Sequence, residues 1–371
     1  MNSFKTLGVH SLLVKRLDEL GIVTPTEIQS QTIPYLLQKN NNLVAQAQTG
    51  TGKTAAFGLP LIEKVSAKNT KIQALILSPT RELVQQIAKQ LFKFTKYYGN
   101  VYTVAVFGGP NMDKQLSLLN KPTQIIVATP GRLIDLLEHK KINIEEVKTI
   151  VLDEADEMLR RGFKTDIDHI LTFTKHKSDI WLFSATMPND IQRIIKKFMS
   201  KGYKEVVIDA KYQVNKNITH EFVVVEPNEK LNQIHQFLRQ QKEDRGVIFC
   251  NTKAESEKLT KQLKARNYQV DVLNGDMNQK EREKVLRAFK SHNLKLLIAT
   301  DVAARGIDIP NLKFVLHHQL PSQIEYYTHR AGRTARAGNK GLSIAFVSPQ
   351  DKKHLKTIEK ELNIKFDATV V

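Results

Sequence analysis

Short apolar runs alternate along the whole chain with longer segments in which apolar residues recur every three or four positions. The runs are rich in β-branched residues, which is typical of strands buried in a sheet. The longer segments, such as RELVQQIAKQLFKF (81–94) and QKEREKVLRAFKSH (279–292), have the period of amphipathic helices. Because strands that alternate with helices form parallel sheets covered on both faces, the pattern predicts an α/β fold.

The predicted strands fall into two groups, separated by the polar, aperiodic stretch DAKYQVNKN (209–217). We therefore expect two lobes, 1–208 and 218–371, joined by a linker at 209–217, each a mostly parallel sheet with helices on both faces. The first group is LVAQA, QALILS, VYTVAVF, QIIVAT, KTIVLD, DIWLFS and EVVI, and the second is HEFVVVE, GVIFCN, QVDVLN, LKLLIAT, FVLHHQ and LSIAFVS.

The charge of the chain favours a polyanionic partner. The 56 Lys and Arg exceed the 38 Asp and Glu, for a net charge of +18. Residues 1–208 hold 28 basic and 19 acidic residues, and the remainder holds the same numbers. Each half therefore contributes +9, and the positive charge does not come from a basic tail.

Three features of the sequence bear on its location in the cell. No run is as long as a membrane span, the first residues lack the apolar core of a signal peptide, and a single cysteine, Cys250, excludes an internal disulfide. These features predict a cytoplasmic protein.

The segment AQTGTGKT (47–54) has the composition of a phosphate-binding loop. It follows a predicted strand and opens a predicted helix, the context that such a loop requires. Its glycines allow the backbone to curl so that N–H groups surround phosphate oxygens, Lys53 can reach the outer phosphates, and the Thr54 hydroxyl can coordinate Mg²⁺. The strict form of the loop has glycine where this chain has Ala47. We expect the nucleotide to be contacted by Ala47, Gln48, Thr49, Gly50, Thr51, Gly52, Lys53 and Thr54.

Three carboxylates, Asp153, Glu154 and Asp156, follow the buried run KTIVLD. Acids are common in the first turn of a helix, where the macrodipole favours them, and by themselves these need no other explanation. With a phosphate loop in the same sheet, however, Asp153 can join the Mg²⁺ shell and Glu154 can polarise the attacking water. Lys53, Asp153 and Glu154 are therefore the expected catalytic residues of this lobe.

With DEAD (153–156) downstream of AQTGTGKT, the chain resembles the DEAD-box family of ATP-dependent RNA helicases, from Phe4 to about Val347. The resemblance implies two tandem RecA-like lobes, of which the first binds ATP. The segment GIVTPTEIQ (21–29) is similar to the family's adenine-sensing segment. By that resemblance Gln29 hydrogen-bonds the adenine, Phe4 stacks on its ring, and Thr24 also contacts the nucleotide. Without the family, Phe4 would be assigned to packing.

Other motifs of the family lie directly after predicted strands, where the ligand-binding loops of an open α/β sheet belong. PTREL (79–83), GG (108–109) and TPGR (129–132) resemble its RNA-binding face. SAT (184–186) resembles the element that couples hydrolysis to strand separation, through Ser184 and Thr186, although hydroxyls there could equally end a strand and cap a helix. In this lobe the resemblance implies RNA contacts at Thr80, Arg81, Gly109, Thr129 and Arg132.

The second lobe has no phosphate loop but carries ATDVAARGIDIP (299–310) and HRAGRTARAG (329–338), similar to the family's fifth and sixth motifs. The resemblance implies that Arg333 and Arg336 act on the γ-phosphate as arginine fingers and that His329 meets the acidic motif. Surface ion pairing is the alternative for any single arginine. Ala335 replaces a glycine common in the family and is expected to restrict the turn beside the fingers. The other implied contacts are Gly306 and Asp308 to the nucleotide, and Asn251, Gly275, Arg282 and Thr300 to RNA.

We therefore expect an RNA-dependent ATPase that separates short RNA duplexes or remodels RNA–protein complexes. Its cofactors would be ATP and Mg²⁺, and its RNA contacts largely sequence-independent. An ATP-gated RNA clamp without productive unwinding and a DNA-translocating helicase are the alternatives, which a turnover assay and a comparison of RNA with DNA stimulation separate. No extra RNA-binding module is recognisable beyond Val347, so we expect protein partners to confer specificity.

Overall fold

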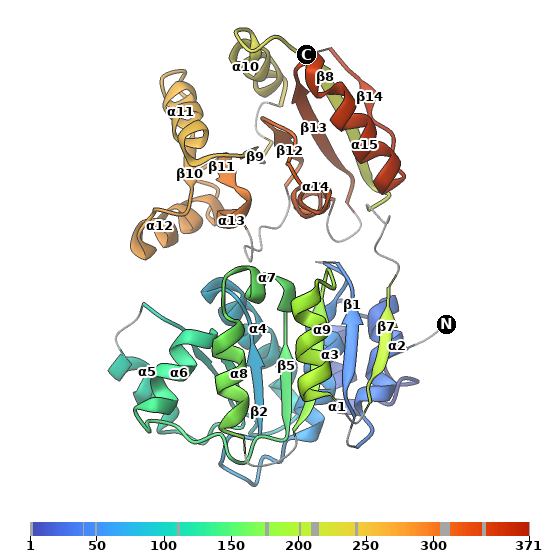
Figure 1. The fold of residues 1–371 in the computed structure, drawn as a ribbon, viewed down its shortest axis with the longest axis vertical. Coiled ribbons are helices and arrows are strands. Elements are labelled where there is room, and N and C mark those ends of the chain that lie inside the picture. Colours follow the sequence, from blue (N-terminus) through green and yellow to red (C-terminus); the bar gives the residue numbers. More distant parts are fainter. Residues whose placement is uncertain are drawn as a thin grey trace. The chain divides into compact units, whose positions relative to one another are not determined.

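The computed structural model describes residues 3–39, 41–48, 50–109, 112–174, 178–199, 202–208, 215–241, 244–304, 312–335 and 339–370. The chain divides into two compact units, Met1–Ala210 and Lys211–Val371 (Figure 1). Each unit contains a seven-stranded sheet with helices packed on it, and every strand pair is parallel. The predicted fold class is confirmed.

The sheet of the first unit has the strand order β3-β4-β2-β5-β6-β1-β7. All seven strands correspond to apolar runs that the sequence predicts. They are β1 (Leu43–Gln46), β2 (Ala74–Leu77), β3 (Thr103–Val106), β4 (Ile125–Ala128), β5 (Thr149–Leu152), β6 (Asp179–Ser184) and β7 (Lys204–Val207). The helices are α1 (Ser11–Glu19), α2 (Glu27–Leu36), α3 (Lys53–Lys64), α4 (Arg81–Phe94), η1 (Thr95–Tyr97), α5 (Met112–Leu119), α6 (Pro130–Glu138), α7 (Ala155–Arg160), α8 (Lys164–Thr172) and α9 (Asn189–Phe198).

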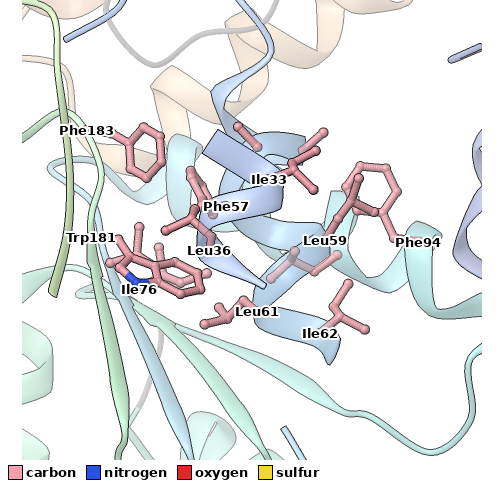
Figure 2. Close-up of a cluster of buried hydrophobic side chains, with 14 of the residues drawn as sticks. Ile33, Leu36, Phe57, Leu59, Leu61, Ile62, Ile76, Phe94, Trp181 and Phe183 are labelled. Carbon is pink, nitrogen blue, oxygen red and sulfur yellow. The ribbon is translucent and has the colours of Figure 1, made fainter. Parts of the chain in front are cut away.

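Two apolar cores cover the two faces of this sheet because successive strand residues point to opposite sides. Leu43 and Ala45 belong to a core with α1, α2, α3 and α4, whereas Val44 belongs to a core with α6, α7, α8 and α9. Figure 2 shows the first core around α3. Trp181 is fully buried there, and its Nε1 donates to the carbonyl of Asn41 at 3.1 Å, so it is a packing residue of this core. Within the described residues no helix is long and apolar enough to cross a membrane.

The sheet of the second unit has the order β10-β11-β9-β12-β13-β8-β14. One face packs against α10 and α11, and the other against α12 to α15. The sequence predicts six of these strands but misses β14, which has only two residues. The elements are β8 (Ile218–Val224), α10 (Lys230–Gln241), β9 (Gly246–Cys250), α11 (Lys253–Lys264), β10 (Val270–Leu273), α12 (Gln279–Lys290), β11 (Leu296–Thr300), α13 (Asp301–Ala304), β12 (Phe314–His317), α14 (Ile324–Ala331), β13 (Gly341–Val347), η2 (Pro349–Asp351), α15 (Lys352–Leu362) and β14 (Asp367–Ala368).

Candidate functional site

The sequence motifs of the first unit gather along one edge of its sheet. Parallel strands end at the same edge, and a motif follows each strand except β7. Along that edge the order is GG after β3, TPGR after β4, PTREL after β2, DEAD after β5, SAT after β6 and the phosphate loop after β1. The three motifs assigned to RNA thus occupy one half of the edge, and the phosphate loop, DEAD and the coupling motif SAT occupy the other.

The phosphate loop has the left-handed backbone that its glycines permit. Gly50 and Gly52 have φ angles of 85° and 93°, and Gly52 caps the N-terminus of α3. Lys53 is 8% exposed, and its Nζ donates to the carbonyl of Ala47 at 2.9 Å. No carboxylate of the described residues lies within ion-pair distance of this buried ammonium. A buried cation without a carboxylate partner, at a positive helix end, suits an anionic ligand.

The adenine-sensing segment is bonded to the phosphate loop. Gln29 is 3% exposed; its Nε2 donates to the carbonyl of Gly52 at 3.0 Å, and its Oε1 accepts from the Thr26 N–H at 2.9 Å. The hydroxyl of Thr26 donates to the carbonyl of Thr51 at 2.8 Å. A Cβ at Gly52 would overlap the Gln29 amide. Gln29 therefore braces the loop, and its assignment to adenine stays a prediction.

The other two residues of this region assigned to the nucleotide, Phe4 and Thr24, take no part in these hydrogen bonds. Phe4 is 1% exposed and belongs to the core on the α1–α4 face of the sheet. The structure thus gives Phe4 a packing role, and the stacking of its ring on adenine stays a prediction. Thr24 is exposed, in the segment before α2.

Asp153 and Glu154 follow β5 directly and differ in environment. Asp153 is 5% exposed, and its Oδ1 has no hydrogen-bond partner among the described residues. Burial raises the pKa of Asp153, although the charge of Lys53 acts in the opposite direction. Glu154 is half-buried and has a left-handed backbone, with φ 51° and ψ 50°, at the N-terminus of α7. Such a conformation in a residue other than glycine is strained and is typical of functional sites.

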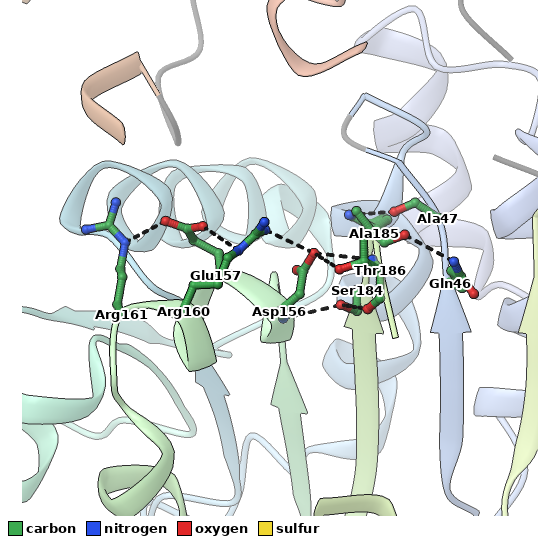
Figure 3. A network of polar contacts seen from close by, with 10 residues as sticks. Gln46, Ala47, Asp156, Glu157, Arg160, Arg161, Ser184, Ala185 and Thr186 are labelled. Atoms are coloured by element: carbon green, nitrogen blue, oxygen red, sulfur yellow. Dashed lines mark hydrogen bonds and ion pairs between the residues drawn. The ribbon is translucent and has the colours of Figure 1, made fainter. Parts of the chain in front are cut away.

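Asp156 connects the DEAD and SAT motifs, a contact that sequence reasoning missed. Its Oδ2 accepts from the Thr186 hydroxyl at 2.8 Å, the Thr186 N–H at 3.2 Å and Arg160 Nη2 at 3.3 Å. Ser184 Oγ accepts from the Asp156 N–H at 3.2 Å and donates to the Thr186 carbonyl at 2.7 Å. Figure 3 shows this network, which continues through Arg160 to Glu157 and on to Arg161. Burial opposes the charge of Asp156, but the Thr186 hydroxyl and Arg160 prevail, so its pKa is lowered.

The same network reaches the phosphate loop through β1. The Ala47 N–H donates to the carbonyl of Ser184 at 2.9 Å, and Gln46 Nε2 donates to the carbonyl of Ala185 at 3.2 Å. Asp156, SAT and the phosphate loop are thus one hydrogen-bonded assembly.

At the other half of the edge, Arg81 lies over the two glycines that follow β3. A Cβ at Gly109 would overlap its guanidinium, and Gly109 has a φ of 108°. Arg81 Nη1 is buried and has no hydrogen-bond partner among the described residues. Thr80 caps α4, where its Oγ1 accepts from the Leu83 N–H at 3.3 Å. Arg81 therefore has an N–H donor without a protein acceptor among the described residues, beside a glycine backbone that no side chain covers. Such an arrangement suits the binding of a phosphate group.

Thr129 and Arg132 follow β4 on the neighbouring loop. Thr129 is the N-cap residue of α6, and Arg132 Nε lies 3.5 Å from Asp135 Oδ2. Both side chains are half-buried.

The second unit builds a buried assembly around Arg330, which the sequence did not single out. Arg330 is 1% exposed; its Nε and Nη2 donate to the two oxygens of Asp301 at 2.6 Å each, and Nη1 donates to the Gln319 carbonyl at 2.8 Å. Nη2 also donates to Asn251 Oδ1 at 2.8 Å. Asn251, an expected RNA contact, is thereby fixed at the end of β9 while Arg330 joins the loops after β9, β11 and β12.

The other expected residues of the second unit that the structure describes differ in burial and in bonding. Arg282 Nη2 donates to the Ala303 carbonyl at 2.7 Å, Gly275 is exposed after β10, and Thr300 ends β11 half-buried. Arg333 is 8% exposed, and its Nε donates to the carbonyl of His329 at 3.2 Å.

Ala335 has a φ of 54°, so the turn expected to be restricted does adopt the left-handed region. Four expected residues lie outside the described part of the chain: Thr49, Gly306, Asp308 and Arg336.

The donor set fits a magnesium ion held by few protein groups. The described residues contain no cluster of three or more His, Cys, Asp or Glu side chains that could hold a metal. Mg²⁺ in nucleotide sites needs only one or two protein oxygens beside the phosphates and water. The unpartnered Asp153 Oδ1 is an oxygen of the kind that such a site needs.

Comparison with known proteins agrees with this geometry. The DEAD/DEAH box helicase model matches residues 26–194, and the helicase conserved C-terminal domain model matches residues 229–338. The chain is 40% identical over 367 residues to the DEAD-box ATP-dependent RNA helicase CshA of Bacillus cereus, covering 99% of this chain and 69% of that protein. It is 41% identical to RhpA of Helicobacter pylori, covering 97% and 73%. The chain belongs to the DEAD-box family.

Solved structures of DEAD-box proteins extend the agreement to the fold. S. cerevisiae Dbp5 bound to RNA and ADP BeF3 has a TM-score of 0.88 at 29% identity, covering all of this chain and 96% of that one. A DEAD box protein from Methanococcus jannaschii has a TM-score of 0.59 at 38% identity, covering 99% of both chains. Both units of this DEAD-box protein are thus RecA-like lobes, and the protein is an ATP-dependent RNA helicase.

Proposed function

We propose that this DEAD-box protein couples ATP binding and hydrolysis to the local unwinding of short RNA duplexes or to the remodelling of RNA–protein complexes. The observation that carries the proposal is the assembly along the first sheet, where Asp156 of DEAD, SAT and the phosphate loop share hydrogen bonds. The RNA-directed loops lie on the same edge, so nucleotide and RNA would be handled by neighbouring strand ends.

In the proposed hydrolysis, the activation barrier is lowered mainly by positioning of the reacting groups and by electrostatic stabilisation of the transition state. The N–H groups at the start of α3 and the ammonium of Lys53 would hold the outer phosphates. Glu154, aimed by its left-handed backbone, would orient the attacking water and accept its proton. Thr54 and Asp153 would hold Mg²⁺, which neutralises developing phosphate charge when bound.

The second unit would complete the reaction. We assign Arg333 and Arg336 to stabilising charge on the γ-phosphate, and Asn251, Gly275, Arg282 and Thr300 to the RNA backbone. Arg330 and Asp301 would keep Asn251 in place. Because most of these groups face phosphates, RNA binding would be largely independent of sequence and sensitive to salt. A cytoplasmic location, suggested by the single cysteine, and protein partners that confer RNA specificity complete the proposal.

The test is ATP turnover by the intact chain with single-stranded RNA, with DNA of the same sequence and without nucleic acid, followed by strand separation of a short RNA duplex. The proposal expects turnover that RNA stimulates and DNA does not, and separation that requires ATP. An ATP-gated clamp would bind RNA in the presence of ATP without turnover, and equal stimulation by DNA would indicate a DNA-directed enzyme.

A further inference from the structure

The exposed face of α4 carries a stripe of polar and basic residues that starts at the RNA-directed loop. The α4 stripe consists of Arg81, Gln85, Lys89, Phe92, Lys93 and Lys96, the last lying just beyond the helix in η1. Steps of three and four residues place its members on one side of a helix. The opposite side, with Val84, Ile87, Leu91 and Phe94, is buried in the core.

Phe92 is the unusual member of the stripe. It is 76% exposed, the highest exposure of any aromatic residue among the large hydrophobic residues described. An apolar ring that projects from a helix amid lysines contributes little to the core.

All charged residues of the α4 stripe are basic, and only some of them form ion pairs within the described part of the protein. From Leu83 to Met112 the chain has no acidic residue. Lys96 is paired with Glu19 at 3.1 Å, but Lys89 and Lys93 have no ion pair in the described structure. Glu82, beside Arg81, is the acid closest in sequence. At the other end Tyr97 lies beneath the ammonium groups of Lys15 and Lys96, each 4.7 Å from its ring centre.

We propose that the α4 stripe is a second RNA-binding surface, which carries a single strand away from the loop site around Arg81 and Gly109. Lysines would contact successive phosphates, and Phe92 would stack on one base. Eleven residues separate Arg81 from Phe92, about 16 Å along the helix, so the stripe extends the loop site by several nucleotides. Combined stacking and phosphate contacts are how proteins bind single strands without reading sequence. The inference rests on the proposed RNA function and adds to it a dependence on RNA length.

The experiment measures the affinity of the intact chain for fluorescent oligouridines of about 6 and about 14 nucleotides, with Mg²⁺ and a non-hydrolysable ATP analogue. Phe92→Ala should weaken binding of the long oligomer about five- to tenfold and leave the short one within about twofold. Phe92→Trp should retain tight binding, whereas Phe92→Leu, which keeps an apolar side chain without a π-face, should not. The pair Lys89→Gln and Lys93→Gln should reduce the salt dependence of long-oligomer binding by about 1.4 in log–log slope.

The matched control is the pair Lys356→Gln and Lys360→Gln on α15, two exposed lysines with the same i, i+4 spacing. These changes remove the same charge and should leave the length dependence unchanged. Wild-type affinity for the long oligomer in the Phe92→Ala and Lys89/Lys93 variants would overturn the inference, as would equal loss in the α15 control. If neither oligomer binds the wild-type protein, the proposed RNA function itself fails.

Discussion

At the scale of single residues, Gln29 is expected to support nucleotide binding by holding the phosphate loop in place. Its amide joins the segment before α2 to Gly52 in the phosphate loop. Gln29→Ala should raise the KM for ATP by about two- to tenfold, the equivalent of one hydrogen bond, and also reduce discrimination against GTP. Steady-state kinetics with both nucleotides test this. Gln31→Ala, on the exposed side of the same helix, should leave both values unchanged; an unchanged KM in Gln29→Ala would show that the brace is not needed.

The sequence predicts where the functional motifs lie, but it predicts little of the conformation and hydrogen bonding of their individual residues. The phosphate loop and the three acids can be located from their neighbours in the chain. The left-handed backbone of Glu154 and the unpartnered oxygen of Asp153 follow from no local pattern, and the bonds of Asp156 to Ser184 and Thr186 join residues 28 and 30 positions apart. The burial of Phe4 likewise follows from tertiary packing that no local pattern contains.

At the scale of elements, the strand order brings together loops that are distant in sequence. The short apolar runs predict thirteen of the strands, but they cannot predict that β4 lies between β3 and β2. That order places Gly109, after β3, against Arg81, at the start of α4. The β14 strand was missed because two exposed residues carry no periodicity.

The two glycines after β3 provide a matched pair of substitutions. Gly109→Ala should weaken RNA binding, because its Cβ would displace the Arg81 guanidinium and its φ of 108° disfavours alanine. Gly108→Ala should have little effect, since its Cβ would meet Arg81 Nη2 at 3.5 Å, an ordinary contact. RNA titrations of both variants, with the KM for ATP as a check on folding, decide the matter. Equal RNA affinity in the two variants would remove Arg81 from the RNA site.

At the scale of the whole molecule, a buried polar network should make stability depend on pH. Tyr327 OH bonds His220 Nδ1 at 2.6 Å and Ser343 Oγ at 2.9 Å, and its ring stacks on His317 at 4.7 Å. Burial lowers the pKa of His220 to about 4, that of His318 to about 4, and that of His317 well below its ordinary value.

The folded protein therefore excludes protons that the unfolded chain binds, and the free energy of unfolding should fall as pH drops from about 6.5 to about 4. The expected loss is on the order of 3 kcal/mol for His220 and for His318 across that window. Urea denaturation at several pH values measures it. His220→Gln should reduce the slope and the exposed His139→Gln should not; a flat profile in the wild-type protein would contradict the burial of these groups.

The most direct test of the whole account is RNA-stimulated ATP turnover by the intact chain, wild type beside Glu154→Gln. The account predicts that RNA raises turnover in the wild type. The variant should bind ATP and RNA as the wild type does but lose about 10²- to 10⁴-fold in kcat, because the water is no longer activated. Glu157→Gln, the same chemical change three residues along the same helix, should retain turnover. Near-normal turnover in Glu154→Gln, or no response of the wild type to RNA, would contradict the account.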